Sequence, residues 1–311
     1  MKIARFTALL GGFALAASAA NTTSYVASTG SDSNACTKAS PCATFQRAYN
    51  QTTYGGAVIA LTGGDFGGVA INGSITIDGG GTGAYIGSAS SGGSLINVTA
   101  SQDSVSIRNL ALLPPINGTP LSASLNLASV LNIENVAVLG GGSNLAVNGF
   151  NISAQSSGMT VSLRNVSLGP SFGSNLACHG GRVELRNVSS AGTAGSNFFN
   201  QPVLTIDGCQ TVIRDSSFQG ASYTAIYLAA GSAPSNTLIK GTDFNGNFVG
   251  LETGYPQPSQ PLNVRIDTST FSGNGIAISV DSAAASVISL RTNIFFNNSI
   301  DGAPALTTSY K

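Results

Sequence analysis

One short motif returns eight times along the sequence, at intervals too short for the duplication of a globular domain. Each copy has an apolar residue, any residue, a second apolar residue, usually a charged residue and often Asn or Asp: VSIRN, LNIEN, VSLRN, VELRN, TVIRD, TLIKG, VRIDT and ISLRT. The second apolar positions lie 22 to 30 residues apart and are Ile107, Ile133, Leu163, Leu185, Ile213, Ile239, Ile266 and Leu290. A stable motif at irregular spacing is typical of stacked coils, in which loops vary in length while strands keep their register.

Two further elements accompany the motif. Five residues after its second apolar position, the C-terminal copies carry Phe218, Phe244, Phe271 and Phe295. An alternating segment then follows, as in NLACH, VLTID, AIYLA, VGLET and IAISV. The motif, the segment around the Phe position and the alternating segment would give each coil three short strands. None of these strands can bury a face alone, so we expect the coils to stack about 4.8 Å apart. The sequence therefore predicts an all-β fold, a right-handed single-stranded parallel β-helix of about ten coils.

Other repeat folds fit the sequence less well. A leucine-rich solenoid would use Leu as its dominant anchor, and a propeller would need four strands in about 40 residues. Helical periodicity is found at 41–52, where Phe45, Ala48 and Tyr49 share one face. We expect this short helix to cover the N-terminal end of the β-helix.

The polar residue that closes the motif is expected to form a bend. Asn and Asp side chains hydrogen-bond to nearby backbone groups and tolerate left-handed backbone dihedrals. We therefore place five residues at one bend of successive coils: Asn109, Asn135, Asn165, Asn187 and Asp215.

Composition excludes several classes of protein. The 311 residues include 13 Lys and Arg against 13 Asp and Glu, and only 8% of residues are charged, compared with about 25% in a typical globular domain. This excludes a coiled coil, a charged helical bundle and a generally basic nucleic-acid binder, so we expect no nucleic-acid partner. A hydrophobic content of 42% also argues against disorder.

The N-terminal segment predicts export. Lys2 and Arg5 precede an apolar run, and Ala17-Ser18-Ala19 forms an A-x-A cleavage pattern; a retained N-terminal anchor is the alternative. No later apolar run is long enough to span a membrane, so we expect none in the mature chain. The predicted organisation is a signal peptide at 1–20, an N-terminal cap segment at 21–56 and the β-helix at 57–311. The predicted location is secreted, either extracellular or periplasmic.

The four cysteines suit an oxidising compartment. Cys36 and Cys42 are close enough in sequence to form a staple within the cap segment. The strand alignment places Cys178 inside and Cys209 at a bend, which argues against a second disulfide. No Cys or His spacing matches a structural zinc site. We expect no cofactor, and no aspartate cluster supports calcium.

The segments YVASTGSDSNACTKASPCATFQRA and GGVAINGSITIDGGG, followed by coils with N-x-x-F, resemble secreted bacterial right-handed parallel β-helix repeat proteins of the pectin-lyase-like superfamily. The resemblance covers nearly all of the mature chain. It implies the β-helix fold, export and a polysaccharide partner, since that superfamily includes pectate lyases, polygalacturonases, alginate lyases and epimerases. The catalytic signatures of these enzymes, such as D-P-H-E and R-x-P-x-x-R, are absent from this sequence.

Candidate catalytic residues come from the third strand of each coil. Alternation places six residues in one outward column, with Tyr227 in the neighbouring one: Asn148, His179, Asp207, Ala229, Glu252 and Ser279. A carboxylate that lies one coil (one rung of the stack) from an imidazole can support general acid–base chemistry. The predicted catalytic residues are therefore His179, Asp207, Tyr227 and Glu252. The alternative is that all four are ordinary solvated residues on a sheet face.

Candidate binding residues come from the charged position of the motif, which should face outward on one sheet. Its occupants are Arg108, Glu134, Arg164, Arg186, Arg214, Lys240, Asp267 and Arg291. We expect Glu134 and Asp267 to pair with their cationic neighbours. The uninterrupted cations suit an anionic polysaccharide because guanidinium binds carboxylate with two hydrogen bonds; the alternative is a solubilising face. The predicted binding residues are Arg164, Arg186, Arg214, Lys240 and Asn148.

The sequence thus predicts a secreted β-helix protein that binds an extracellular polysaccharide along its stacked sheets. The alternative is a polysaccharide lyase or glycoside hydrolase that acts on an acidic polysaccharide. The oligomeric state does not follow from the sequence.

Overall fold

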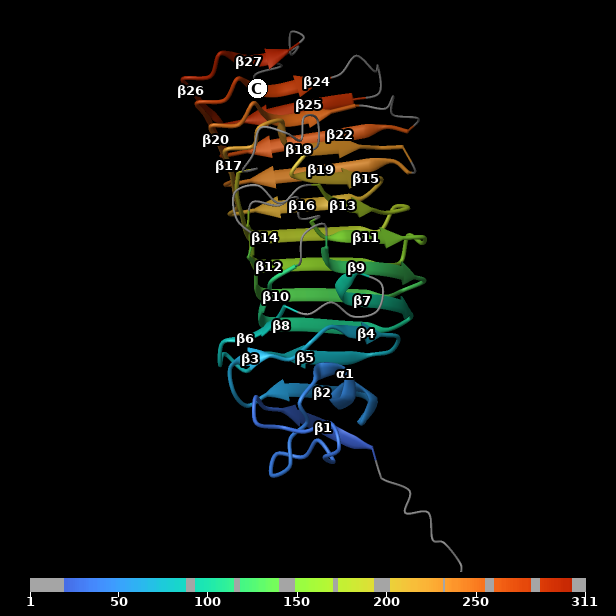
Figure 1. Cartoon of the computed structure of the whole chain (residues 1–311). Coiled ribbons are helices and arrows are strands. Elements are labelled where there is room, and N and C mark those ends of the chain that lie inside the picture. Colours follow the sequence, from blue (N-terminus) through green and yellow to red (C-terminus); the bar gives the residue numbers. More distant parts are fainter. Residues whose placement is uncertain are drawn as a thin grey trace, which may run out of the picture.

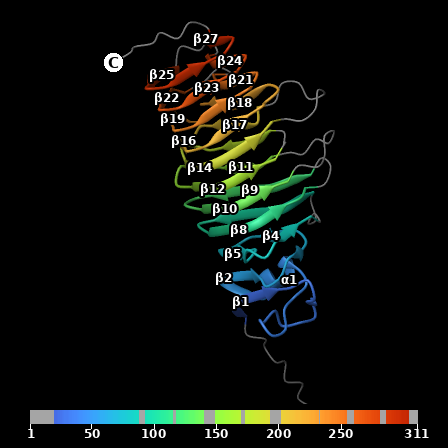
Figure 2. The same cartoon turned by 90° about the vertical axis from the view of Figure 1, so that its left-hand side faces the viewer.

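A computed structural model of the protein describes residues 20–87, 93–114, 118–139, 149–169, 173–192, 202–231, 233–254, 260–280 and 286–303. These residues form a single elongated stack of short strands that rises in chain order from the N-terminal to the C-terminal end (Figures 1 and 2). The predicted signal segment, except for residue 20, and the predicted binding residue Asn148 lie outside the described residues. Within the described ranges, no helix is long and apolar enough to cross a membrane.

The strands belong to two parallel sheets. The first sheet has 17 strands: β1 (Asn21–Val26), β2 (Thr52–Ala60), β3 (Gly64–Asp65), β5 (Ile75–Asp78), β6 (Ala84–Ile86), β8 (Ser104–Leu112), β10 (Val130–Val138), β12 (Thr160–Leu168), β14 (Arg182–Ala191), β16 (Gln210–Arg214), β17 (Ser217–Gln219), β19 (Ser235–Lys240), β20 (Asp243–Asn245), β22 (Leu262–Asp267), β23 (Thr270–Ser272), β25 (Ser286–Arg291) and β26 (Ile294–Phe296).

The second sheet has 10 strands, which follow one another in a single series: β4 (Val69–Ile71), β7 (Ser94–Ser101), β9 (Thr119–Asn126), β11 (Asn151–Ala154), β13 (Ser174–Ala177), β15 (Leu204–Asp207), β18 (Thr224–Ala229), β21 (Val249–Thr253), β24 (Ile276–Val280) and β27 (Ile300–Ala303). From β4 onward the chain alternates between the two sheets, so each of these coils contributes strands to both. The parallel β-helix predicted from the sequence is confirmed.

The register between coils follows the motif. Ile107 is paired with Ile133, Ile133 with Leu163, and the series continues without a slip to Leu290. Ile77, on β5, extends the same column by one coil toward the N-terminus. All members except Leu290 are buried in the core. A residue in one coil therefore lies directly above its counterpart in the next.

The predicted phenylalanine column is also present. The ring centroids of Phe218 and Phe244 are 5.8 Å apart, those of Phe244 and Phe271 are 4.6 Å apart, and those of Phe271 and Phe295 are 5.2 Å apart. All three pairs are stacked face to face, because the coil spacing of about 4.8 Å suits ring contact. Asn247 and Asn274, which are buried beside this column, hydrogen-bond to the equivalent Asn of the next coil at 3.0 and 2.9 Å.

The motif's polar residues form the expected bend. Asn109, Asn135, Asn165, Asn187 and Asp215 all have φ between 51° and 57°. Each Asn amide donates to the side-chain oxygen of its counterpart one coil nearer the N-terminus, at 2.8 to 3.1 Å. The ladder begins at Asp78, which accepts from Asn109. Asn suits this position because it tolerates the left-handed conformation and carries both a donor and an acceptor.

A short helix lies beside the first strands of the stack. Helix α1 (Phe45–Asn50) packs against β1, β2 and β4, and Phe45 and Ala48 are buried. The helix is shorter than the predicted 41–52, because Cys42 lies in a bridge with Val26 and Thr44 is the N-cap. Cys36 and Cys42 form the predicted disulfide.

A second disulfide links Cys178 and Cys209, so the expectation that these residues stay apart is wrong. Cys178 follows β13 and Cys209 follows β15, which is the next strand of the second sheet. Both residues are fully buried, and their Cα atoms are 5.0 Å apart. The bend at Cys209 turns its side chain into the core instead of away from it. Two disulfides are typical of proteins that fold in an oxidising compartment.

The phenylalanine column should stabilise the fold strongly. Replacing Phe244 with Ala removes a fully buried ring and its stacking contacts on both sides, so the free energy of unfolding should fall by about 3–5 kcal/mol. Denaturant unfolding followed by far-ultraviolet circular dichroism measures this change. Phe248→Ala is the matched control, since that ring is 57% exposed. Equal losses in the two variants would contradict the assignment of the column to the core.

Candidate functional site

The outer face of the first sheet carries three columns of side chains between β12 and β22. On β16, Gln210, Val212 and Arg214 point outward, while Thr211 and Ile213 are buried. Alternation repeats this arrangement on β19 with Asn236, Leu238 and Lys240. We name the columns by their chemistry: an amide column (Gln210, Asn236, Asn263), an aliphatic column (Val212, Leu238) and a cation column (Arg164, Arg186, Arg214, Lys240).

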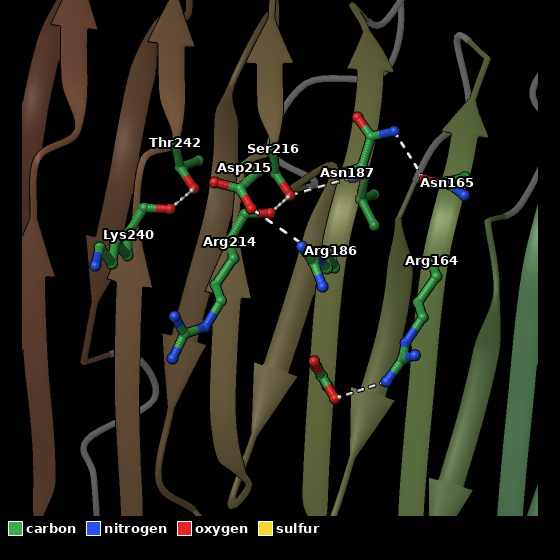
Figure 3. Close-up of polar contacts among 11 residues, drawn as sticks. Arg164, Asn165, Arg186, Asn187, Arg214, Asp215, Ser216, Lys240 and Thr242 are labelled. Carbon is green, nitrogen blue, oxygen red and sulfur yellow. Dashed lines mark hydrogen bonds and ion pairs between the residues drawn. The ribbon is translucent and has the colours of Figure 1, made fainter.

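The cation column was predicted, and the register confirms its order. Arg164 is paired with Arg186, Arg186 with Arg214, and Arg214 with Lys240. The four side chains leave the same face of successive strands (Figure 3). Glu134 precedes the column and Asp267 follows it, so the four cations form one uninterrupted run.

Two of the four cations are neutralised by acids from neighbouring positions. Arg164 lies 3.4 Å from Glu184, and Arg186 lies 3.8 Å from Asp215. Arg214 and Lys240 form no ion pair with any residue that the structure describes. These adjacent positive charges repel one another in the free protein, which favours the binding of an anion between them.

The ion pairs expected within the column do not form. We predicted that Glu134 would pair with Arg108 or Arg164, but Arg108 lies 2.8 Å from Asp78 on β5 instead. Asp267 was expected to pair with Lys240 or Arg291, but its partner is Arg265 on the same strand, at 2.6 Å. Asp78 and Arg265 were not considered as partners because neither occupies a charged position of the eight motif copies.

An open groove of about 520 Å³ runs over the amide and aliphatic columns. Its lining includes Gln210, Val212, Asn236, Leu238, Asn263 and Arg265. The cation column borders the groove, since Arg214 and Lys240 lie two residues beyond Val212 and Leu238 on their strands. Sequence reasoning missed the two other columns, although they occupy the outward positions two and four residues before the motif's charged residue.

The amide column is ordered by hydrogen bonds along the stack. The Asn236 amide donates to Gln210 Oε1 at 2.8 Å, and the Asn263 amide donates to Asn236 Oδ1 at 3.0 Å. Each amide nitrogen has two N–H donors and each amide oxygen has two lone pairs. The ladder uses one N–H of Asn236 and of Asn263, so the second N–H of each can bind a ligand.

The predicted catalytic residues lie on the second sheet and do not form the expected cluster. We predicted His179 one rung from Asp207, but the register pairs Ala177 with Asp207. His179 is exposed after the end of β13. Glu252 was placed in the Asp207 column, but its neighbours are Tyr227 and Ser279. Both errors are slips of two residues, which leave the alternation of inward and outward positions unchanged.

The carboxylates of this second group bind local donors. Asp207 Oδ1 accepts from the Gly231 backbone N–H at 2.7 Å, and Glu252 Oε2 accepts from the Thr224 hydroxyl. Tyr227 is 9% exposed and lies beside Glu252. In the described part of the chain, no group of three or more His, Cys, Asp or Glu side chains could hold a metal ion.

Asp78, at the end of β5, binds several donors at once. Burial alone would raise the pKa of this carboxyl. Hydrogen bonds from Asn109, the Gly80 backbone N–H and Arg108 lower the pKa by more than burial raises it, so the net pKa lies below its usual value. Asp78 thereby anchors both the asparagine ladder and the guanidinium of Arg108.

These features define a parallel β-helix with a largely apolar groove, bordered by cations, on the outer face of one sheet. The solved structure of pectate lyase Pel9A shares the fold, with a TM-score of 0.62 and 15% sequence identity over 94% of this chain and 81% of that chain. The GH136 lacto-N-biosidase from Eubacterium ramulus matches with a TM-score of 0.48 and 12% identity, over 88% of this chain and 67% of that chain. The A-module of the Azotobacter vinelandii mannuronan C-5 epimerase AlgE4 matches with a TM-score of 0.40 and 10% identity, over 84% of both chains. No protein-family model matches the sequence, and a search of curated proteins finds no significant match.

The Asp78 network should make stability depend on pH. Its lowered pKa stabilises the folded protein above the ordinary carboxyl pKa of about 4, and this contribution is lost as the pH falls through the folded-state value. Asp78→Asn should therefore lower the melting temperature at pH 7, and the difference from the unmodified protein should shrink below about pH 4. Thermal unfolding at a series of pH values tests this. The exposed Asp243→Asn variant should show no such pattern, and an Asp78→Asn deficit that is constant with pH would contradict the argument.

Proposed function

We propose that the protein binds an acidic polysaccharide in the groove on the outer face of the first sheet. The observation that carries the proposal is the pair of cations Arg214 and Lys240, which border the groove on adjacent strands without an ion-pair partner in the described ranges. A bound carboxylate relieves the repulsion between them and accepts charge-assisted hydrogen bonds.

The shape of the site favours a polymer over a small molecule. Small-molecule sites are concave and bury most of their ligand, whereas this groove is open and crosses β16, β19, β22 and β25. Chemically equivalent side chains recur on the neighbouring strands β16 and β19, about 4.8 Å apart. A linear glycan also presents equivalent groups at regular intervals, so successive sugars can make the same contacts with successive coils.

The protein's location is proposed to be extracellular or periplasmic. Two disulfides suit an oxidising compartment, and residues 1–20 have the pattern of a cleaved signal peptide. The solved structure of pectate lyase Pel9A shares the fold, which supports a polysaccharide partner.

Removing the unpaired cations should weaken binding. The Arg214→Gln/Lys240→Gln variant loses the charge-assisted contacts, so its affinity for a polyuronate such as polygalacturonate or alginate should fall at least tenfold, or about 1.4 kcal/mol. Isothermal titration calorimetry at low and physiological salt measures the change. Lys38→Gln removes an exposed cation from the cap segment and is the matched control. Unchanged affinity in the double variant would overturn the assignment of the groove.

The alternative function, a lyase or hydrolase that acts through His179, Asp207, Tyr227 and Glu252, predicts turnover of the bound polymer. Because the register separates His179 from Asp207, we expect no product that depends on His179. Incubation with acidic polysaccharides, followed by ultraviolet absorbance and reducing-end assays, tests this. Turnover that disappears in His179→Ala but persists in Arg214→Gln/Lys240→Gln would establish the alternative in place of the proposed function.

A further inference from the structure

We infer that the groove selects acidic polysaccharides whose sugars carry acetyl groups. The inference rests on the proposed function and names the substrate class of the same site. Its basis is a window of two strands, β16 and β19, in which three kinds of side chain recur in the same order.

The two strands of the window present matching sets of side chains. β16 carries Gln210, Val212 and Arg214, and β19 carries Asn236, Leu238 and Lys240 in register with them. Outward residues on one strand are separated by about 7 Å. Each rung therefore offers an amide, an aliphatic group and a cation over about 14 Å, measured between the outermost Cα atoms.

The window is bounded by charged residues that already have partners. In the aliphatic column, Glu184 precedes Val212 and Arg265 follows Leu238. Glu184 pairs with Arg164, and Arg265 pairs with Asp267. The unpaired cations Arg214 and Lys240 thus occur on the same two strands as the aliphatic side chains. This coincidence indicates one subsite that is apolar at its centre and positively charged along one border.

An acetyl group fits the centre of this subsite. Its methyl group can pack on Val212 and Leu238, which are half-buried in the largely apolar lining of the groove. Its carbonyl oxygen can accept from the unused N–H of the amide column. The sugar carboxylate then faces the cation column. A plain uronic acid satisfies the cations but leaves the aliphatic pair without a matching group.

The flat faces of sugar rings are a weaker match for the aliphatic pair. Ring faces are commonly bound by aromatic side chains, and none of the described residues that line this groove is aromatic. Val212 and Leu238 present branched methyl groups over a small area instead. A small methyl-terminated substituent covers that area better than the edge of a hydroxylated ring.

The test compares matched polymers that differ in the acetyl group but not in charge. Polygalacturonate and its chemically O-acetylated form make one pair. Hyaluronan and a form in which each N-acetyl group is replaced by an N-formyl group make the other; the nitrogen stays neutral and only the methyl group is lost, so the two pairs distinguish O-linked from N-linked acetyl groups. Burial of one methyl group strengthens binding about three- to fourfold, so two occupied rungs should give about a tenfold preference for the acetylated polymer of at least one pair. Calorimetric affinities at fixed salt provide the measurement.

Variants separate this inference from the proposed function. Val212→Thr/Leu238→Thr places Thr, a β-branched residue that suits strands, at both positions and removes the apolar surface. The preference should therefore fall to about threefold or less while the affinity for plain polygalacturonate is retained. Val287→Thr, outside the window but at the edge of the groove, should keep the preference. Equal affinity for both polymers of each pair, or a preference that survives in the double Thr variant, overturns the inference alone. Absence of binding to every polymer overturns the proposed function and the inference with it.

Discussion

The unbroken parallel register between successive coils is the constraint on which the rest of the structure depends. Every coil places an apolar residue beneath its counterpart in the next coil, from Ile77 to Leu290. A slip of one residue would turn the buried face of a strand to solvent, so the hydrophobic core itself fixes the register. Inside the stack this produces the phenylalanine column and the buried asparagine ladder. At the bend it produces the exposed asparagine ladder that begins at Asp78.

The same register gives the outer face its chemistry. Residues that are 26 positions apart in sequence, such as Arg214 and Lys240, become neighbours at the spacing of one rung. A single charged, amide or aliphatic position in the repeat is thereby extended into a column. Function on such a surface depends on where a column is interrupted. Arg164 and Arg186 have acidic partners, whereas Arg214 and Lys240 have none among the described residues, and the aliphatic pair Val212 and Leu238 occurs on the same strands.

The repeat motif was sufficient to predict the fold, the cation column and the bend residues, because each of these depends only on position within the motif. The Cys36–Cys42 disulfide was predicted from the short separation of the two residues in the cap segment. The second sheet was harder to predict. Alternation distinguishes inward from outward positions but does not detect a slip of two residues, and such slips misplaced His179 and Glu252. The Cys178–Cys209 disulfide was missed because the direction of a side chain at a bend does not follow from strand alternation. The partners of Arg108 and Asp267 were missed because Asp78 and Arg265 lie outside the charged positions of the motif copies.

A crystal structure of the protein with a short acetylated uronic acid oligosaccharide would test the account most directly. The account predicts that the sugar chain crosses β16 and β19, with carboxylates beside Arg214 and Lys240 and acetyl methyl groups on Val212 and Leu238. An oligosaccharide bound instead over β15, β18 and β21, beside Asp207 and Glu252, would contradict it.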